Sequence, residues 1–149
     1  MRIDIERILT ELETLPEYDD QIALQGVDGA SDPMYGTGWL KDLSHAEEDF
    51  TEALFDIPYT NSVIESLGMT RTRVMRLEQK TCYSYHKDPT KRIHIPIITN
   101  VDCLMIIDDE IIRYPADGSY YVMDTTKMHT AVNASYEDRI HLVGCISDI

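Results

Sequence analysis

Several features that define large protein classes are missing from the 149-residue sequence. It has no run of about 18 apolar residues, so it predicts no membrane-spanning helix. Its first twelve residues mix acids and bases instead of placing a basic stretch before an apolar one, so we expect no secretion signal. The three cysteines, Cys82, Cys103 and Cys145, are odd in number and lack CxxC spacing. They predict free thiols in a cytoplasmic location, and neither a disulfide framework nor a thiolate zinc site.

Basic side chains are also scarce. Lys and Arg number 13 against 27 for Asp and Glu, which gives a formal net charge of -14. This charge repels phosphate backbones and anionic membrane surfaces, so we expect neither a nucleic acid nor a membrane as a partner. Residues 1–68 carry 3 basic and 16 acidic side chains, whereas residues 69–149 carry 10 and 11. We therefore expect one domain over residues 1–149, in which an acidic helical cover (1–68) surrounds a nearly neutral β core (69–149).

Three helices are expected in the N-terminal part. The spacing of Ser44 and Glu47 is that of a capping box and predicts a helix that runs to about Asp56. A shorter helix is expected over residues 61–67, ended by Gly68. The first helix of the chain is predicted by an apolar stripe at helical spacing, made of Ile5, Ile8, Leu9 and Leu12.

The stretch from Gly26 to Gly38 is rich in glycine and predicts a loop, preceded by a short strand within residues 21–24. Its length allows two interpretations. It is a lid over a functional site, with Tyr35 and Trp39 as contacts, or it is a disordered connector.

After Gly68 the apolar period shifts toward two, and turn residues separate short runs rich in β-branched and aromatic side chains. Such closely spaced strands predict an antiparallel sandwich or barrel, so we expect a mainly β fold with N-terminal helices. The runs cover residues 70–77, 82–85, 92–99, 103–107, 110–114, 119–123 and 139–146.

His86 and Asp88 are the first candidates for chemistry, because side chains at positions i and i+2 of a strand project to the same face. Both can then reach one metal ion, although a hydrogen-bonded surface pair is the alternative. His129 follows 43 residues after His86, and Arg139 opens the last predicted strand. In a jelly roll the late strands return alongside the early ones, so these residues can converge. Two imidazoles and a carboxylate form the facial arrangement that leaves open positions for Fe(II) oxygenase chemistry.

Arg92 and His94 share one strand face, opposite the face of Ile93 and Ile95. A surface ion pair for Arg92 and a satisfied core histidine for His94 are the alternatives to a role in ligand binding. His141 shares the strand parity of Arg139 and is expected to be structural.

Two further pairs on strand faces have alternative interpretations. We expect Arg71 and Arg73 to be solvated strand positions paired with the acidic helices, and the alternative is that they bind an acidic substrate. Tyr83 and Tyr85 flank the His86 motif, where they line a substrate pocket or simply pack.

These motifs together resemble the aspartyl/asparaginyl β-hydroxylase family of Fe(II) and 2-oxoglutarate oxygenases. The resemblance covers about residues 70–147. It rests on several short matches along the sequence: His86-x-Asp88, Arg92-x-His94, the approach from Asp117-Gly118 to Asp124, and the block His129-Thr-Ala-Val-Asn with Arg139 ten positions after its histidine.

The resemblance implies a double-stranded β-helix, the cupin-like jelly roll, with Fe(II) held by His86, Asp88 and His129. It also implies that Arg139 binds the distal carboxylate of the cosubstrate 2-oxoglutarate. Arg92 and His94 would then lie by the carboxylate nearer the metal. The expected reaction is hydroxylation of an amino acid, free or in a peptide or protein, with molecular oxygen as the other substrate.

Two positions differ from the family pattern. The founding animal enzymes have glycine where this chain has Asp88, so the complete triad is closer to that of related hydroxylases of free amino acids. Met75 stands where those enzymes place a hydroxyl that helps to hold the cosubstrate. Thr81, Ser84 or a tyrosine is the substitute for that hydroxyl.

Two other functions are compatible with parts of the sequence. A cupin-like metal protein that performs no oxidation, either a lyase or isomerase or a small-molecule sensor, would keep the three ligands but has no need of Arg139. An interaction module that docks a basic partner would use only the acidic N-terminal half. The sequence carries no signal for the oligomeric state.

Overall fold

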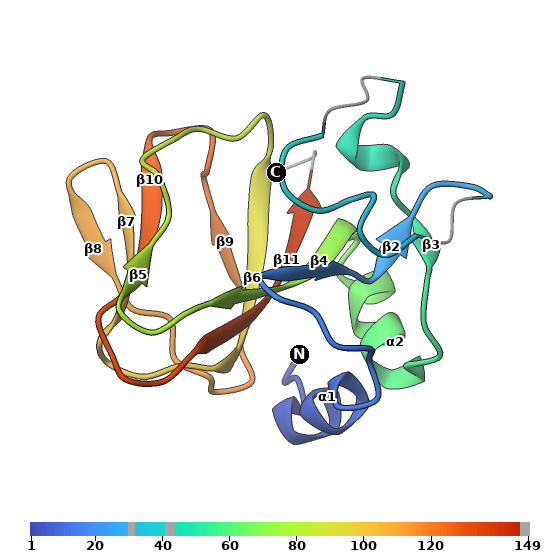
Figure 1. Cartoon of the computed structure of the whole chain (residues 1–149), viewed down its shortest axis with the longest axis horizontal. Coiled ribbons are helices and arrows are strands. Elements are labelled where there is room, and N and C mark those ends of the chain that lie inside the picture. The colour runs from blue at the N-terminus through green and yellow to red at the C-terminus, as the bar shows by residue number, and fades with distance from the viewer. Residues whose placement is uncertain (30–31, 41–43, 147–149) are drawn as a thin grey trace.

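The computed structural model describes residues 1–29, 32–40 and 44–146. Two antiparallel sheets face each other, and two helices and a two-stranded ribbon lie beside them (Figure 1). The elements in chain order are α1 (Ile5–Leu12), β1 (Gln21–Ala23), β2 (Gln25–Gly26), a 3-10 turn (Glu47–Asp49), β3 (Glu52–Ala53), α2 (Pro58–Ser66), β4 (Thr70–Leu77), β5 (Thr81–Cys82), β6 (Lys91–Ile98), β7 (Cys103–Ile107), β8 (Glu110–Ile112), β9 (Tyr121–Met123), β10 (His129–Asn133) and β11 (Arg139–Ile146).

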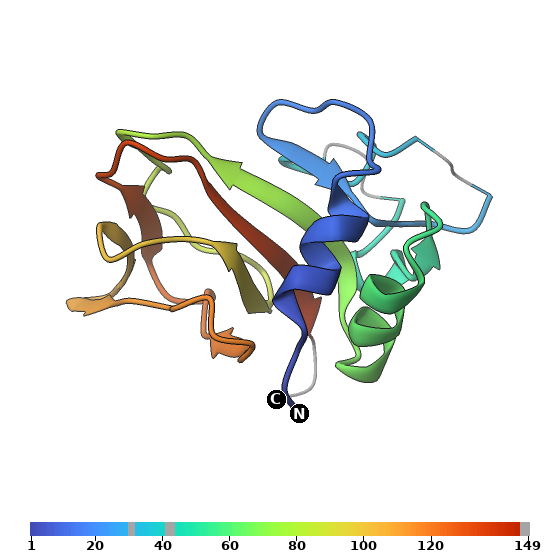
Figure 2. The ribbon, with the colours of Figure 1, turned by 90° about the horizontal axis from the view of Figure 1, so that it is seen from below.

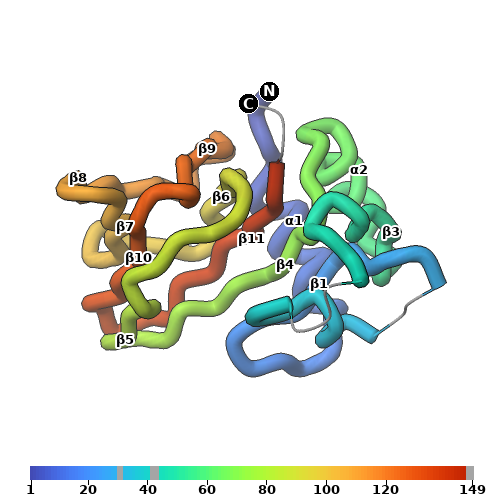
Figure 3. Tube along the Cα trace, turned by 90° about the horizontal axis from the view of Figure 1, so that it is seen from above, coloured from blue at the N-terminus to red at the C-terminus, as the bar shows by residue number. Residues whose placement is uncertain are grey.

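The strand order is that of a jelly roll. The large sheet has the order β1-β4-β11-β6-β9 and the small sheet the order β5-β10-β7-β8. From β4 onward the chain passes back and forth between the two sheets, and β11, the last strand, lies between β4 and β6. Figure 3 shows these three strands running side by side. The expected double-stranded β-helix is therefore confirmed.

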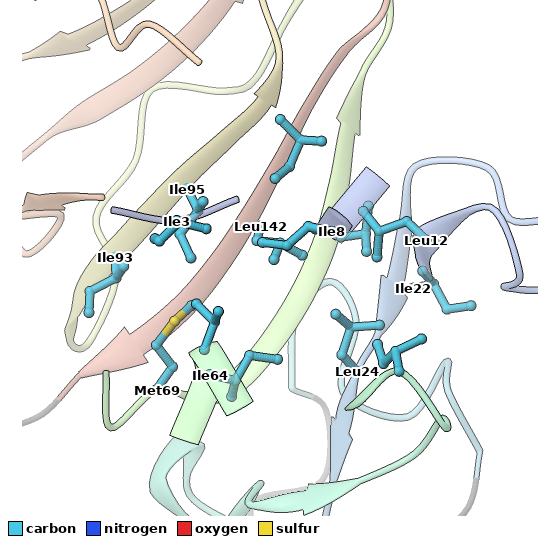
Figure 4. Packing of buried hydrophobic residues seen from close by; sticks show 14 of the residues in the cluster. Ile3, Ile8, Leu12, Ile22, Leu24, Ile64, Met69, Ile93, Ile95 and Leu142 are labelled. Carbon is cyan, nitrogen blue, oxygen red and sulfur yellow. The ribbon is translucent and has the colours of Figure 1, made fainter. Parts of the chain in front are cut away.

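Side chains of the large sheet alternate between an apolar outer face and a polar inner face. On the outer face Ile95 and Leu142 pack with Ile8 of α1 and Ile64 of α2 (Figure 4). Figure 2 shows α1 lying across this sheet with α2 beside it. The main apolar core thus lies between the sheet and the helices, which leaves the space between the two sheets for buried polar side chains, namely Arg71, Arg73, Arg92, His94, Arg139 and His141.

Two of the three expected helices form. In α1 the apolar stripe is confirmed, because Ile8 and Leu12 are buried, and the Asp4 carboxylate caps the helix by accepting the backbone N–H of Arg7 at 3.1 Å. The second, α2, begins at Pro58 instead of residue 61. It ends before Gly68, whose φ of 65° lies in the left-handed region that glycine adopts without strain.

The helix expected from Ser44 to about Asp56 is wrong. This region contains only the 3-10 turn at Glu47–Asp49 and the short strand β3, which pairs with β2. The Glu47 carboxylate does not cap a helix, because it is buried and bonded to the guanidinium groups of Arg71 and Arg92. Pairing two buried cations outweighs a surface helix cap, which is worth about 1 kcal/mol.

The strand predictions hold for the long strands. β4, β7 and β11 have the expected bounds, and β6 is shifted by one residue. β5, β8 and β9 are shorter than expected, and β10 was not predicted as a strand. β10 has the sequence HTAVN, which is short, has no aromatic residue and ends in Asn133, a residue typical of turns.

Two absences expected from the sequence can be compared with the described residues. Within residues 1–29, 32–40 and 44–146 there is no helix with the length and apolarity needed to cross a membrane. Cys82, Cys103 and Cys145 are all unpaired, which confirms the free thiols.

Candidate metal centre and ligand pocket

The structure brings His86, Asp88 and His129 together. Each offers one ligand atom, and these atoms all lie within 4.8 Å of one another. A backbone bridge fixes the two histidines, because the N–H of each donates to the carbonyl of the other at 3.0 and 2.9 Å. Asp88 Oδ2 lies 3.2 Å from Nε2 of His129, and Oδ1 lies 3.6 Å from Nε2 of His86. The predicted ligand set is thus a compact cluster formed by β10 and the segment that follows β5.

Backbone carbonyls set the tautomer of both histidines. Nδ1 of His86 lies 2.7 Å from the Ser84 carbonyl, and Nδ1 of His129 lies 2.8 Å from the Lys127 carbonyl. Because a carbonyl oxygen only accepts, each Nδ1 carries a hydrogen, and Nε2, the atom that faces Asp88, is the ring atom left to bind a metal. An outer hydrogen bond of this kind is the usual support of a metal-ligating histidine.

Asp88 is held as a carboxylate. Burial by itself would raise its pKa, but the hydrogen bond with His129 and the charge of Arg92, whose Nη2 lies 3.5 Å from Oδ1, lower the pKa below its ordinary value. The backbone of Asp88 is also fixed, because its N–H donates to the Thr125 carbonyl at 2.8 Å. An ionised, positioned carboxylate is what a divalent cation requires of this ligand.

The cluster opens into a cavity of about 600 Å³ between the two sheets, a size typical of small-molecule sites. Arg139 lines this cavity and is only 2% exposed. Its Nη1 lies 3.5 Å from the Met105 sulfur, and neither its Nε nor its Nη2 has a hydrogen-bond partner among the described residues. The buried hydroxyl of Tyr83 has no partner there either, and the Arg139 guanidinium lies 6.0 Å from the Tyr83 ring centroid. Buried donors without acceptors are costly, so this end of the cavity suits an anionic ligand.

Arg92 and His94 line the same cavity and have different hydrogen-bond partners. The Arg92 guanidinium is bound to both oxygens of Glu47, at 2.9 and 3.2 Å, besides its contact with Asp88. Nδ1 of His94 lies 3.0 Å from Nδ1 of His141, so one ring donates and the other accepts, and both rings are neutral. Burial, with the charges of Arg139 and Arg92, lowers the pKa of His94 to about 3. His141 is the buried structural partner that we expected.

Comparison with known proteins identifies the family. A family model described as aspartyl/asparaginyl beta-hydroxylase matches residues 2–147. The chain belongs to this family. No curated protein matches it.

Solved structures similar to this hydroxylase-family chain include one whose TM-score, above 0.5, supports the fold. An oxidoreductase of the 2OG-Fe(II) oxygenase family from Burkholderia pseudomallei has a TM-score of 0.54 at 18% identity, over 93% of this chain and 75% of that one. A cupin domain from Bordetella pertussis has a TM-score of 0.45 at 14% identity, over 52% of this chain and 81% of that one. The plu4264 protein of Photorhabdus luminescens has a TM-score of 0.42 at 18% identity. That likeness covers 48% of this chain and 57% of the Photorhabdus protein.

Sequence reasoning on this hydroxylase-family chain missed the buried charges around the cavity. The expectation that Arg71 and Arg73 are solvated is wrong, because they are 4% and 5% exposed. Arg71 donates to Glu47 at 2.7 Å and to the carbonyls of Gly36 and Gly38. Burial by itself would raise the pKa of Glu47, but the Arg92 charge and the surrounding hydrogen bonds lower it. The sequence did contain a signal: Arg71 and Arg73 alternate with apolar or β-branched residues in β4, which is typical of a strand with one polar face.

The loop and tyrosine hypotheses are partly supported in this member of the family. Gly38 and Trp39 line the cavity, whereas Tyr35 stacks on Phe50 with ring centroids 5.7 Å apart. Residues 30–31 of the loop lie outside the described residues. Tyr83 lines the cavity, whereas Tyr85 is 51% exposed and donates to the Asp108 carbonyl.

Proposed function

We propose that this chain is an Fe(II)- and 2-oxoglutarate-dependent dioxygenase that hydroxylates an amino acid, free or in a peptide or protein. The observation that carries the proposal is the presence, in one cavity, of a three-ligand cluster and a buried, unpartnered guanidinium group, that of Arg139. Membership of a hydroxylase family supports the class of reaction.

The three ligands fit Fe(II) in number and type. Nε2 of His86 and of His129 would bind the ion together with the Asp88 carboxylate, which leaves a single positive charge at the site. When bound, Fe(II) and 2-oxoglutarate supply the oxidising chemistry: one atom of O2 enters the substrate as hydroxyl, and the other enters succinate as 2-oxoglutarate loses CO2.

Arg139 fits the distal carboxylate of 2-oxoglutarate. Its two unpartnered nitrogens, Nε and Nη2, form the planar fork that matches a carboxylate. His94 has only Nε2 left for a ligand, because its Nδ1 is committed to His141. We expect His94 and Arg92 beside the carboxylate nearer the metal, where Arg92 acts while bound to Glu47 and beside Asp88.

A non-oxidative cupin-like metal protein is the alternative. It needs the metal ligands but not a buried guanidinium group that has no carboxylate partner among the described residues. Arg139 therefore favours the oxygenase, and the two functions differ in one measurable property, which is binding of 2-oxoglutarate through Arg139.

Anaerobic calorimetry with Fe(II) and 2-oxoglutarate tests the proposal. We expect 2-oxoglutarate to bind only when metal is present, and His129→Ala to abolish both events. Arg139→Gln should keep the metal affinity and weaken 2-oxoglutarate binding by about 100-fold, because each charge-assisted hydrogen bond contributes about 1.5–3 kcal/mol. Arg113→Gln is the matched control for Arg139→Gln, because Arg113 is exposed.

Admission of oxygen and a panel of amino acids and peptides should then yield succinate in the wild-type protein and not in His129→Ala. Metal binding that is not followed by 2-oxoglutarate binding would favour the cupin-like alternative. Equal 2-oxoglutarate affinity in the wild-type protein and Arg139→Gln would contradict the role given to Arg139.

A further inference from the structure

Arg73 is a second cation in the cavity that no carboxylate of the described residues neutralises. It lies on β4, lines the cavity and is 5% exposed. Among the described residues, it makes one hydrogen bond, from Nη1 to Oε1 of Gln21 at 3.2 Å, and its buried Nε has no partner. Among the described residues, no carboxylate lies within ion-pair distance of Arg73.

The neighbouring Arg71 shows what a structural arginine looks like here. It is two positions away on the same strand face, and its guanidinium is used fully, by the Glu47 carboxylate and by the carbonyls of Gly36 and Gly38. Arg73 has none of these partners. Burial, followed by the charge of Arg71, lowers the pKa of Arg73 to about 10, so it stays charged at neutral pH. A buried charge without a counterion is destabilising unless a ligand supplies one.

Arg73 and Arg139 serve different parts of the cavity. Arg139 pairs in register with Leu77 of β4, whereas Arg73 pairs with Val143 of β11. Arg73 is therefore four positions from Leu77, which is roughly 13 Å along a strand. The two side chains therefore enter the cavity from well-separated positions along the strand. If Arg139 holds the distal carboxylate of 2-oxoglutarate, Arg73 is left for the anion of another molecule.

Arg73 lies at the end of the cavity that is lined by Gly38 and Trp39. Gln21 Oε1 accepts from Arg73 and also from the N–H of Gly38, at 3.0 Å, so Gly38 and Arg73 are tied to the same side chain. The Gln21 amide nitrogen makes no hydrogen bond to a described residue and is a second donor beside Arg73. Trp39, next in sequence, lines the cavity and is 78% exposed, which marks this end as the open one.

The acids of the cavity are already used. Glu47 is paired with Arg71 and Arg92, Asp88 belongs to the metal cluster, and Glu48 lies exposed to solvent. We infer that the substrate carries a carboxylate group, and that Arg73, with the Gln21 amide, binds this group while the rest of the substrate extends toward the metal. This inference rests on the proposed function and makes Arg73 a specificity-determining residue.

The test measures binding to the anaerobic complex with Fe(II) and 2-oxoglutarate, so that it does not depend on turnover. The probes are the L-amino acids and their N-acetyl derivatives, each compared with its own carboxamide. We expect at least one acid to bind at least 10-fold more tightly than its amide. Arg73→Gln should weaken the acid by at least 10-fold, leave the amide within 2-fold, and leave 2-oxoglutarate within 3-fold of wild type.

Two further variants keep the result interpretable. Arg73→Lys retains the charge but loses the fork, so the acid should bind with intermediate affinity, and this variant replaces Arg73→Gln if the latter fails to fold. Arg76→Gln is the matched control, because Arg76 lies on the same strand and lines a different pocket.

Each contrary outcome has a definite meaning. Equal binding of acids and amides, or no binding of any acid by a complex that binds 2-oxoglutarate, would overturn the inference and leave the proposed function standing. Loss of 2-oxoglutarate instead of the acid in Arg73→Gln would assign Arg73 to the cosubstrate. If O-phosphoserine binds in an Arg73-dependent way and none of the other probes does, the group that Arg73 binds is a phosphate and not a carboxylate. Failure of 2-oxoglutarate to bind at all would contradict the proposed function itself.

Discussion

At the scale of single residues, the hydroxyl of Tyr83 is the polar group that best completes the Arg139 subsite. The family resemblance implies a hydroxyl that helps to hold 2-oxoglutarate, but Met75 occupies its expected position. Of the substitutes, Thr81 is exposed and donates to the Gln79 carbonyl. The Tyr83 hydroxyl is buried and unpartnered, and burial raises its pKa although the charges of Arg139 and Arg73 oppose the shift. A neutral phenol donor beside a guanidinium group suits a carboxylate.

Removing this hydroxyl should weaken cosubstrate binding selectively. We expect Tyr83→Phe to bind 2-oxoglutarate about 10-fold more weakly than wild type, which corresponds to about 1.4 kcal/mol for one lost hydrogen bond. Fe(II) affinity should not change. Thr81→Ala and Ser84→Ala are the controls and should stay within 2-fold in the same calorimetric titration. If Ser84→Ala shows the loss and Tyr83→Phe does not, the hydroxyl belongs to Ser84.

The residues that could be predicted from the sequence were those whose chemistry depends on a short spacing. His86 and Asp88 are two positions apart and meet at one point, although neither lies in a strand as we expected: His86 makes an isolated bridge with His129 after β5 ends. His129 and Arg139 stand at fixed positions of a family pattern. Glu47 could not be found in this way, because its spacing from Ser44 is also that of a helix cap. Only the tertiary structure shows that two buried arginines need its carboxylate. The same long-range pairing explains why Arg71 was expected to be solvated.

At the scale of elements, the two helices depend on each other. The first turn of α2 has no side-chain cap of its own, because its N-cap residue is Ile57. Instead the Glu11 carboxylate of α1 accepts the backbone N–H groups of Tyr59 and Thr60, at 3.0 and 2.7 Å, and the Thr60 hydroxyl, at 2.7 Å. A carboxylate at a helix N-terminus also interacts favourably with the helix dipole. Glu11 therefore joins α1 to α2.

Glu11→Gln should lower the free energy of unfolding by about 1 kcal/mol at pH 7, the usual value of a helix cap. Burial alone would raise the pKa of Glu11, but the hydrogen bonds from Thr60 and Tyr59 lower it below the ordinary 4.5. A lowered pKa means that the stabilisation is complete above pH 4.5 and is lost as the pH falls through the folded-state value. Urea titrations of both proteins should therefore converge below pH 4.5. Glu13→Gln, at an exposed position of the same helix end, should match wild type throughout.

Helices and strands could be predicted where their own residues carry a clear helical or strand pattern. The period of α1 and the long β-branched runs of β4 and β11 need no partner to be recognised. β10 is recognised only through its neighbours, because its five residues pair with β7 along their whole length and with β5 at one end. The strand that carries His129 was thus not predicted from its own sequence, and neither were the two-residue strands β2 and β3.

At the scale of the whole molecule, the net charge of the chain and the charge of its cavity have opposite signs. The chain carries a net charge of -14, yet the cavity between the sheets gathers Arg71, Arg73, Arg92 and Arg139. Glu47 and Asp88 are the buried or half-buried carboxylates that oppose these cations there. An acidic exterior around a cationic cavity rejects polyanions by long-range repulsion while small carboxylates are bound at short range. This arrangement agrees with both anion-binding roles that we assign to the cavity.

Salt should therefore stabilise the protein. Raising NaCl from 20 to 500 mM screens the repulsion among exposed carboxylates, whereas the buried pairs of Glu47 are screened little. We expect a gain on the order of 1 kcal/mol, which raises the melting temperature of a chain this long by about 2–4 °C. Chloride bound in the cavity would also stabilise the fold, so the same scan on Arg73→Gln separates the causes. A gain that persists in the variant reflects general screening, a gain that disappears reflects anion binding at Arg73, and a loss of stability with salt in the wild-type protein would contradict net repulsion.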